Sequence, residues 1–242
     1  MKLYDDVIKK TLALFEGIEA KCYPIQTVDW PDLGNNNMVL RSDMAYELGG
    51  TGFPGVGCTS ITADASFVPK DEILLYGREL SELSADAPYA RIAIARVGED
   101  SLGEGNTLYN AIKKIEYTRY HFSPKGFMLR ISSINRRETA RVEKEALQEG
   151  LSFEKIGNLM LQSFHENPKI EAVKLIFVNL EDFPYDTLLD YVKKADGITK
   201  TIDHMMKNII MDCDACSLQE ICDEVEGLRE LHFAEGANNQ QQ

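Results

Sequence analysis

The stretch AVKLIFVNL, residues 172–180, is the most strand-like run in this 242-residue chain. β-Branched and aromatic residues dominate it, and these residue types fit the pleated, buried surface of a strand. A short apolar run of this kind is typical of a strand in the interior of a sheet. We therefore predict that residues 172–180 form a central strand.

Strands and helices alternate around this stretch. Further strands are predicted at YARIAIARV (89–97) and GFMLRISSI (126–134). Helical patterns cover residues 3–16, 106–122, 136–150, 152–167, 184–195 and 200–211. Residues 23–70, rich in proline, glycine and asparagine, predict loops and short strands. This order predicts an α/β (α+β) fold, with a mixed sheet flanked by helices and a short helical C-terminal segment that bears cysteines.

The pattern divides the chain at about residue 200. Residues 1–200 are predicted to form one α/β domain, and residues 201–236 a helical segment that binds a metal or a cluster. Residues 237–242, ANNQQQ, are predicted to be a disordered tail. The length suits one large domain with a small appendage.

The charge and hydropathy of the sequence argue against nucleic acids and membranes as partners. The formal charge is −13, from 26 Lys and Arg against 39 Asp and Glu, which argues against a nucleic-acid binder because phosphate contacts need a basic surface. No run of apolar residues is long enough to predict a membrane-spanning helix. The N-terminal MKLYDDVIKKTLALF resembles an amphipathic helix and not a signal peptide, so a cytoplasmic location is predicted.

A glycine-rich loop satisfies the dinucleotide fingerprint G-x-G-x-x-G at Gly50, Gly52 and Gly55. That motif binds a pyrophosphate only where it follows a strand and opens a helix. Here Pro54 stands inside the loop, and the extended, β-branched VGCTSIT follows it. A tight loop is therefore the better interpretation.

The C-terminal segment CDACSLQEICDEVEGLRELH, residues 213–232, holds three of the five cysteines. Cys213, Cys216, Cys222 and His232 give the spacing C-x2-C-x5-C-x9-H, and three thiolates with one imidazole can hold a zinc ion. An iron–sulfur cluster is the other candidate. Two interpretations without a metal remain open: Cys222 belongs to an apolar helix stripe, or the C-x2-C pair is a redox dithiol.

The distance along a helix decides whether His232 can join the cysteines. Ten residues of continuous helix between Cys222 and His232 span about 15 Å, which is too far for one small ion. Either the helix breaks near Gly227 or another residue supplies the fourth ligand, and Cys58 in the glycine-rich region is the best remote candidate.

These cysteines, the stretch SDMAYELGG (42–50) and the strand–helix run of residues 89–180 together resemble the acetyl-CoA synthase (β) subunit of the carbon monoxide dehydrogenase/acetyl-CoA synthase complex. The resemblance implies that Cys213, Cys216 and Cys222 hold a [4Fe–4S] cluster, with His232 at the position of the fourth cysteine. It also implies that Arg130, Arg136 and Arg137 contact coenzyme A, as the middle domain of that family is thought to do. The alternative is that these arginines are solvated residues at a strand end and a helix start. The resemblance covers the middle α/β domain and the start of the cluster domain.

The sequence also departs from that family. The gap between the second and third cysteines is short, and the C-G-C pair that binds the distal nickel is absent. Nickel is therefore not expected in this chain alone. The resemblance implies an accessory or electron-transfer iron–sulfur protein of anaerobic one-carbon metabolism, with partners in a CO dehydrogenase/corrinoid methyl-transfer system. The alternatives are a non-redox scaffold with structural zinc and one chain of a split acetyl-CoA synthase.

Overall fold

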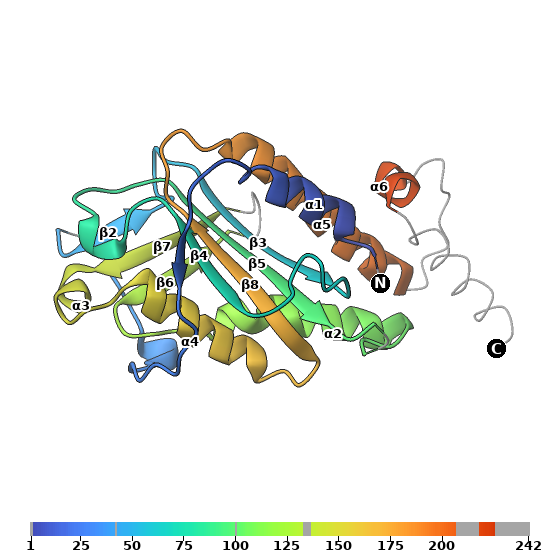
Figure 1. Cartoon of the computed structure of the whole chain (residues 1–242), viewed down its shortest axis with the longest axis horizontal. Helices are drawn as coiled ribbons and strands as arrows, with labels where there is room; N and C mark the ends of the chain where they lie inside the picture. The colour runs from blue at the N-terminus through green and yellow to red at the C-terminus, as the bar shows by residue number, and fades with distance from the viewer. Residues whose placement is uncertain (1, 42, 100, 133–136, 207–217, 226–242) are drawn as a thin grey trace, which may run out of the picture.

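A computed structural model describes residues 2–41, 43–99, 101–132, 137–206 and 218–225 of the protein (Figure 1). Its core is a five-stranded sheet in the order β1-β4-β8-β5-β3. The strands are β1 (Lys21–Tyr23), β3 (Gly55–Thr62), β4 (Glu72–Tyr76), β5 (Tyr89–Val97) and β8 (Ile170–Val178). The mixed α/β architecture predicted from the sequence is confirmed.

Strand β8, which contains most of the predicted run 172–180, is the central strand of this sheet. It pairs in parallel with β4, through partners such as Leu74 and Ile176, and antiparallel with β5. The two outer pairs also differ: β3 runs parallel to β5, and β1 antiparallel to β4. The prediction of a central strand here is therefore confirmed.

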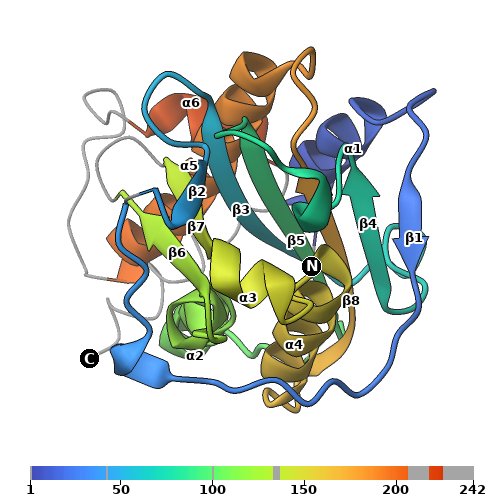
Figure 2. The same cartoon turned by 90° about the vertical axis from the view of Figure 1, so that its left-hand side faces the viewer.

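A second, three-stranded antiparallel sheet lies beside the first (Figure 2). Its order is β2-β7-β6, with β2 (Ala45–Leu48), β6 (Phe127–Ile131) and β7 (Glu138–Glu143). The helix predicted over residues 136–150 is wrong for most of its length, because Glu138–Glu143 form strand β7 and only Lys144–Gln148 are helical, as α3. Residues in β7 alternate between buried and half-buried, which is the strand period.

Helices cover the five-stranded sheet. They are α1 (Asp5–Ala13), α2 (Gly105–Tyr117), α4 (Phe153–His165) and α5 (Tyr185–Met206), whereas α6 (Gln219–Glu224) packs on α5. Short 3-10 helices are η1 (Gly34–Asn36), η2 (Leu80–Glu82) and η3 (Thr118–His121). α1 and α5 lie side by side, and α4 packs against β8 and β4 (Figure 1). α2 contacts the edge strand β3 and α5. None of the helices in the described part of the chain has the length and apolar character needed to cross a membrane.

Helix boundaries follow the local sequence in two informative cases. Ser152 caps α4, because its hydroxyl accepts the N–H of Lys155 at 3.2 Å. Most of the helix predicted over 184–195 and the described part of the helix predicted over 200–211 belong to one helix, α5, which runs without interruption to Met206, and residues 207–211 lie outside the described part of the chain. α5 therefore spans residue 200, where the sequence pattern suggested a division.

A fully buried ion pair joins the two sheets. Arg91 of β5 donates from Nε to Glu138 Oε1 at 2.6 Å and from Nη2 to Glu138 Oε2 at 2.8 Å, and both side chains have no exposed area. Burial acts to lower the pKa of Arg91, but the Glu138 charge and hydrogen bonds raise the pKa above its ordinary value. Arg91 and Glu138 therefore form a charged, bidentate joint inside the protein.

The glycine-rich loop and the start of β3 pack against Glu138 of this ion pair. It connects β2 to β3, so a strand follows it and not the helix that a dinucleotide site needs. A Cβ on Gly57 would overlap the Glu138 carboxylate, and one on Gly55 would press on the Glu138 backbone. The glycines here allow close packing of the two sheets.

Candidate functional site

Four arginines line a pocket of about 360 Å³ on the small sheet. The lining residues are Arg41, Glu47, Gly50, Thr51, Arg130, Ile131, Ser132, Arg137, Thr139 and Arg141. Thr139 and Arg141 alternate along β7 with Glu138, so they project from the strand face opposite the buried joint. We call this cavity the arginine pocket.

The floor of the arginine pocket is a cross-strand ion pair. Glu47 on β2 and Arg141 on β7 are register partners, and Arg141 Nε donates to Glu47 Oε1 at 3.0 Å. Only 7% of the Glu47 side chain and 15% of the Arg141 side chain are exposed. Gly50 makes this placement possible, since a Cβ there would overlap the Glu47 carboxylate. The floor is therefore ordered and mostly shielded from water.

The rim consists of two arginines that contact the same glutamate less closely. Arg41 Nη1 lies 3.5 Å from Glu47 Oε2, and Arg130 Nη1 lies 3.7 Å from Glu47 Oε1. Each rim side chain is 53% exposed. These separations are longer than a normal hydrogen bond, so both guanidinium groups keep N–H donors that Glu47 does not engage.

Arg137 connects the pocket to the glycine-rich loop. Its Nε donates to Gly49 O at 3.0 Å, and its Nη2 donates to Phe53 O at 2.7 Å and also to Gly50 O. These carbonyl contacts fix the guanidinium plane at the pocket wall. Arg137 thus both orders the loop and contributes a positive charge.

The charges that line the pocket favour an anion. Four arginines and one glutamate leave an excess of three positive charges on a chain whose formal charge is −13. Arginine presents paired N–H donors that match the oxygen atoms of phosphate and carboxylate groups. The pocket is therefore suited to a phosphate-bearing or carboxylate-bearing ligand.

The structure brings together two of the three arginines singled out for an anionic ligand. Arg130 and Arg137 line one pocket, whereas Arg136 lies outside the described residues. Sequence reasoning missed Arg41, Glu47 and Arg141. The spacing of Arg137, Thr139 and Arg141 at every second residue places them on one face of a strand, and this signal was masked by the helix predicted for the same segment.

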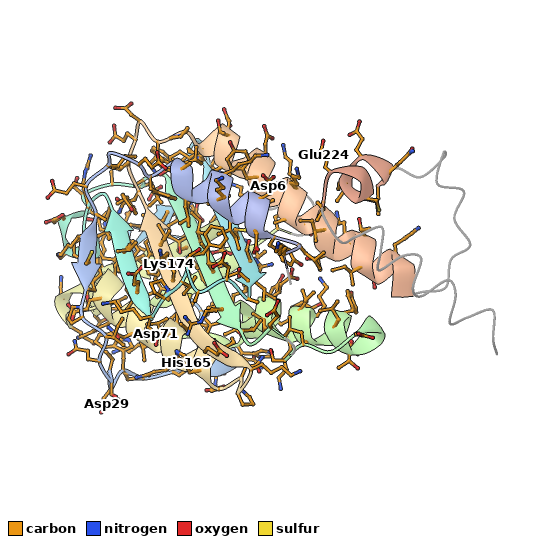
Figure 3. All side chains as sticks on the ribbon, turned by 45° about the vertical axis from the view of Figure 1, so that its right-hand side comes forward. Asp6, Asp29, Asp71, His165, Lys174 and Glu224 are labelled. Atoms are coloured by element: carbon orange, nitrogen blue, oxygen red, sulfur yellow. The ribbon has the colours of Figure 1, made fainter. Side chains whose placement is uncertain are left out.

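The cysteine-bearing helix α6 docks on α5. The Ile221 side chain fills the space beside Gly197, where a Cβ would overlap it, and Val225 is 7% exposed. Lys194 Nζ lies 2.6 Å from Glu224 Oε2 and 3.6 Å from Asp6 Oδ2. Figure 3 labels Asp6 and Glu224, on the neighbouring helices α1 and α6. These contacts hold α6 beside the N-terminal helix.

Cys222 lies on this docked helix, half-buried and packed against the core. Cys213, Cys216 and His232 lie outside the described residues. α6 ends at Glu224, and Val225 has an extended backbone with φ −101° and ψ 111°. The continuous helix that would carry the chain about 15 Å beyond Cys222 therefore stops early, which removes that objection to His232 as a ligand.

Cys58, the remote candidate ligand, is 6% exposed in strand β3. Its Sγ lies 3.4 Å from Ser60 Oγ, and burial raises the pKa of the thiol. A metal or cluster ligand must be a thiolate, and burial disfavours that form more than the nearby charges of Arg91 and Arg119 favour it. These features fit a packing role in the sheet. Within residues 2–206 and 218–225, less the short gaps, no group of three or more His, Cys, Asp or Glu side chains is arranged to hold a metal.

Comparison with protein-family models gives no match, and a search of curated proteins gives none either.

Proposed function

We propose that this protein is an acetyl-CoA synthase-like iron–sulfur protein of the cytoplasm, and that its arginine pocket binds the phosphate-bearing end of coenzyme A. The observation that carries the proposal is the convergence of four arginines on one pocket, Arg130 and Arg137 among them. A volume of about 360 Å³ is within the range of small-ligand sites and suits part of coenzyme A.

In this proposal the arginines recognise the phosphate of coenzyme A through their charge and through the positions of their N–H groups. Arg141 is held in place by Glu47 and needs little reorganisation when the ligand enters. Arg41 and Arg130 on the rim swing onto the phosphate oxygens and form charge-assisted hydrogen bonds. Thr51, Ser132 and Thr139 add hydroxyl or backbone contacts to the same lining.

Coenzyme A titration by calorimetry tests the pocket. The rim variant Arg130→Gln is expected to bind coenzyme A about tenfold more weakly, because one charge-assisted contact is lost. Arg78→Gln is the matched control, since Arg78 is 58% exposed and paired with Glu181 away from the pocket. The affinity of the Arg78→Gln variant for coenzyme A should equal that of the wild type. Pantetheine, which has no phosphate, is expected not to bind.

Equal binding of pantetheine and coenzyme A, or equal affinity in both arginine variants, would contradict the phosphate role. A rise in salt concentration from about 0.05 M to about 0.5 M should weaken coenzyme A binding, because screening shortens the range of these charges.

The cluster is tested by metal analysis of protein purified without oxygen. Cys213, Cys216 and Cys222 would hold a [4Fe–4S] cluster, which supplies one-electron transfer when bound. We expect a brown protein with about four iron atoms per chain, and loss of iron in Cys222→Ala. A colourless protein that carries zinc would overturn this assignment in favour of a structural zinc site.

Identification of the proteins that bind this chain tests its proposed role in one-carbon metabolism. Because the chain contains no C-G-C pair, we propose that any acetyl-CoA synthesis requires a partner chain that binds nickel. Co-purification with CO dehydrogenase or corrinoid methyl carriers, together with CO-dependent activity, would support an accessory or split-enzyme role. Activity that is indifferent to Cys216→Ala would count against a cluster in the reaction.

A further inference from the structure

A second pocket, of about 510 Å³, lies between α2 with η3 and the end of α4. Its lining residues are Asn110, Lys113, Lys114, Tyr117, Thr118, His121, Ser163, Glu166 and Asn167. None of these residues lines the arginine pocket. We call this cavity the α2–α4 pocket.

An unsatisfied buried donor marks the wall of the α2–α4 pocket. Asn167 is 7% exposed, and its Oδ1 accepts the backbone N–H of Lys169 at 3.2 Å. This bond orients the amide, and the buried Nδ2 then has no hydrogen-bond partner among the described residues. Buried polar groups are nearly always paired, and this unpaired N–H belongs to a residue that lines the pocket.

The same pocket has two lysines and one glutamate, Glu166, beside an exposed ring. Lys113 Nζ lies 5.6 Å from the centroid of the Tyr117 ring and 3.1 Å from Glu116 Oε2. Lys114 is exposed and forms no ion pair with a described residue. Tyr117 is 48% exposed, which is high for a large aromatic side chain. A cation and a flat ring on one wall suit a ligand that has both an anionic group and an aromatic system.

We propose that the α2–α4 pocket binds a nucleoside monophosphate. Lys113 and Lys114 contact the phosphate, and lysine is a common phosphate ligand as a point charge. Tyr117 provides the ring on which the base stacks. The exposed carboxamide of Asn110 carries both donor and acceptor groups, which match the edge of a purine. This site is independent of the coenzyme A proposal, because it shares no residue with the arginine pocket.

Calorimetric titration with AMP, adenosine and inorganic phosphate tests the proposal. AMP is expected to bind at least about tenfold more tightly than adenosine or phosphate, since only AMP engages both the lysines and the ring. Lys114→Glu and Tyr117→Ala, both at exposed positions, are each expected to weaken AMP binding by about tenfold. Far-UV circular dichroism and thermal unfolding of both variants confirm that they fold.

Two matched variants serve as controls. Lys9→Glu makes the same charge change at an exposed position on α1, and Tyr191→Ala removes a half-buried tyrosine of α5 that does not line the pocket. Both should bind AMP like the wild type. AMP binding that is absent, or that is equal in all four variants, overturns the proposal. So does inorganic phosphate that binds as tightly as AMP.

A coenzyme A titration of the same variants separates the two sites. Lys114→Glu is expected to leave coenzyme A affinity unchanged, whereas Arg130→Gln lowers it and leaves AMP affinity unchanged. If Lys114→Glu lowers both affinities to the same extent, the α2–α4 pocket is part of the coenzyme A site and a separate nucleotide site is excluded.

Discussion

The two faces of β7 carry arginine–glutamate clusters with opposite properties. On one face, Glu138 meets Arg91 in a bidentate pair with no exposed area. On the other, Arg141 meets Glu47 at the floor of a pocket whose rim arginines are half exposed. The same residue types therefore serve as a sealed joint between sheets and as an open site for an anion.

The number of partners around each carboxylate explains this difference. Glu138 uses both oxygens on Arg91, and Arg119 Nη1 lies 3.8 Å away at the edge. Glu47 has three arginines within 3.7 Å, of which only Arg141 makes a hydrogen bond of normal length, and Arg41 also lies 3.9 Å from Asp86 Oδ2. The Arg91–Glu138 pair, in which both charges are paired, stabilises the fold. The arginines around Glu47 exceed the carboxylate in charge and therefore favour the binding of a further anion.

Glu138→Gln should have the largest effect on stability, because it leaves the Arg91 charge buried without a counter-ion. We expect the free energy of unfolding to fall by about 3–5 kcal/mol, measured by urea denaturation. The double variant Arg91→Leu with Glu138→Leu should recover much of this loss, since it removes both charges. A single variant within about 1 kcal/mol of wild type would contradict the role of a sealed joint.

Gly57→Ala and Gly50→Ala compare the two clusters by the same added methyl group. At Gly57 the methyl group meets the Glu138 carboxylate, which has no room to move, and we expect a loss of about 1–3 kcal/mol. At Gly50 it meets the Glu47 carboxylate, which can shift toward the open pocket. Gly50→Ala should therefore cost less stability in the same denaturation experiment. The reverse ranking would show that the pocket floor is the more rigid cluster.

The stability of the protein at alkaline pH tests the surroundings of the Arg91–Glu138 pair, because Cys58 lies beside that pair. The Cys58 carbonyl oxygen accepts a hydrogen bond from Arg91 Nη1 at 3.3 Å. Burial raises the pKa of the Cys58 thiol above its ordinary value of 9.0, so the folded chain keeps a proton that the unfolded chain releases. The stabilisation is complete below about pH 9 and declines above it, by at most about 1.4 kcal/mol per pH unit. The stability difference between wild type and Cys58→Ala should shrink from about pH 8 to about pH 10. A constant difference would mean that the thiol does not titrate differently on folding.

Glu47→Gln should have the smallest effect on stability. The amide oxygen still accepts from Arg141, so the free energy of unfolding should change by less than about 1 kcal/mol. Coenzyme A affinity should rise by about threefold to tenfold, because Glu47 no longer competes with the ligand for Arg41 and Arg130. Weaker binding would indicate that the Glu47 charge is needed to organise the arginines. Chemical denaturation and calorimetry on one preparation give both values.

Much of the large sheet was predictable because its strands have a strong local pattern. Strand β5 coincides with the predicted range 89–97, and the predicted run at 172–180 overlaps β8. Strand β7 was missed because its buried face includes a charge. Glu138 belongs to that face with Ala140 and Val142, and its partner Arg91 is 47 residues earlier in the chain. A charged residue in a sequence is predicted to be exposed unless the residue that pairs with it is known.

The arginine pocket was predictable only in part for a similar reason. Arg130 and Arg137 stood out as basic residues near a predicted strand end. Arg41 and Glu47 join them only because β2 pairs with β7, a long-range contact between short strands with weak local signals. The cysteine spacing was visible in the sequence, but of its four residues only Cys222 lies in the described part of the chain. The cluster itself stays a prediction.

The central position of β8 has a consequence for how the chain is made. β8 pairs with both β4 and β5, yet it is the last strand of the sheet to leave the ribosome. Until residue 178 has emerged, β4 and β5 each have one unpaired edge that faces no partner. Such edges are where nascent chains associate wrongly.

Synthesis should therefore pass through a vulnerable interval between the translation of Tyr89–Val97 and that of Ile170–Val178. The two pairs β1–β4 and β3–β5 can form early on their own, and β8 then closes the space between them. Its residues Val173, Leu175 and Phe177 are fully buried, so its arrival unites two half-sheets into one core. The time at which this core forms is thus set by the synthesis of its central strand.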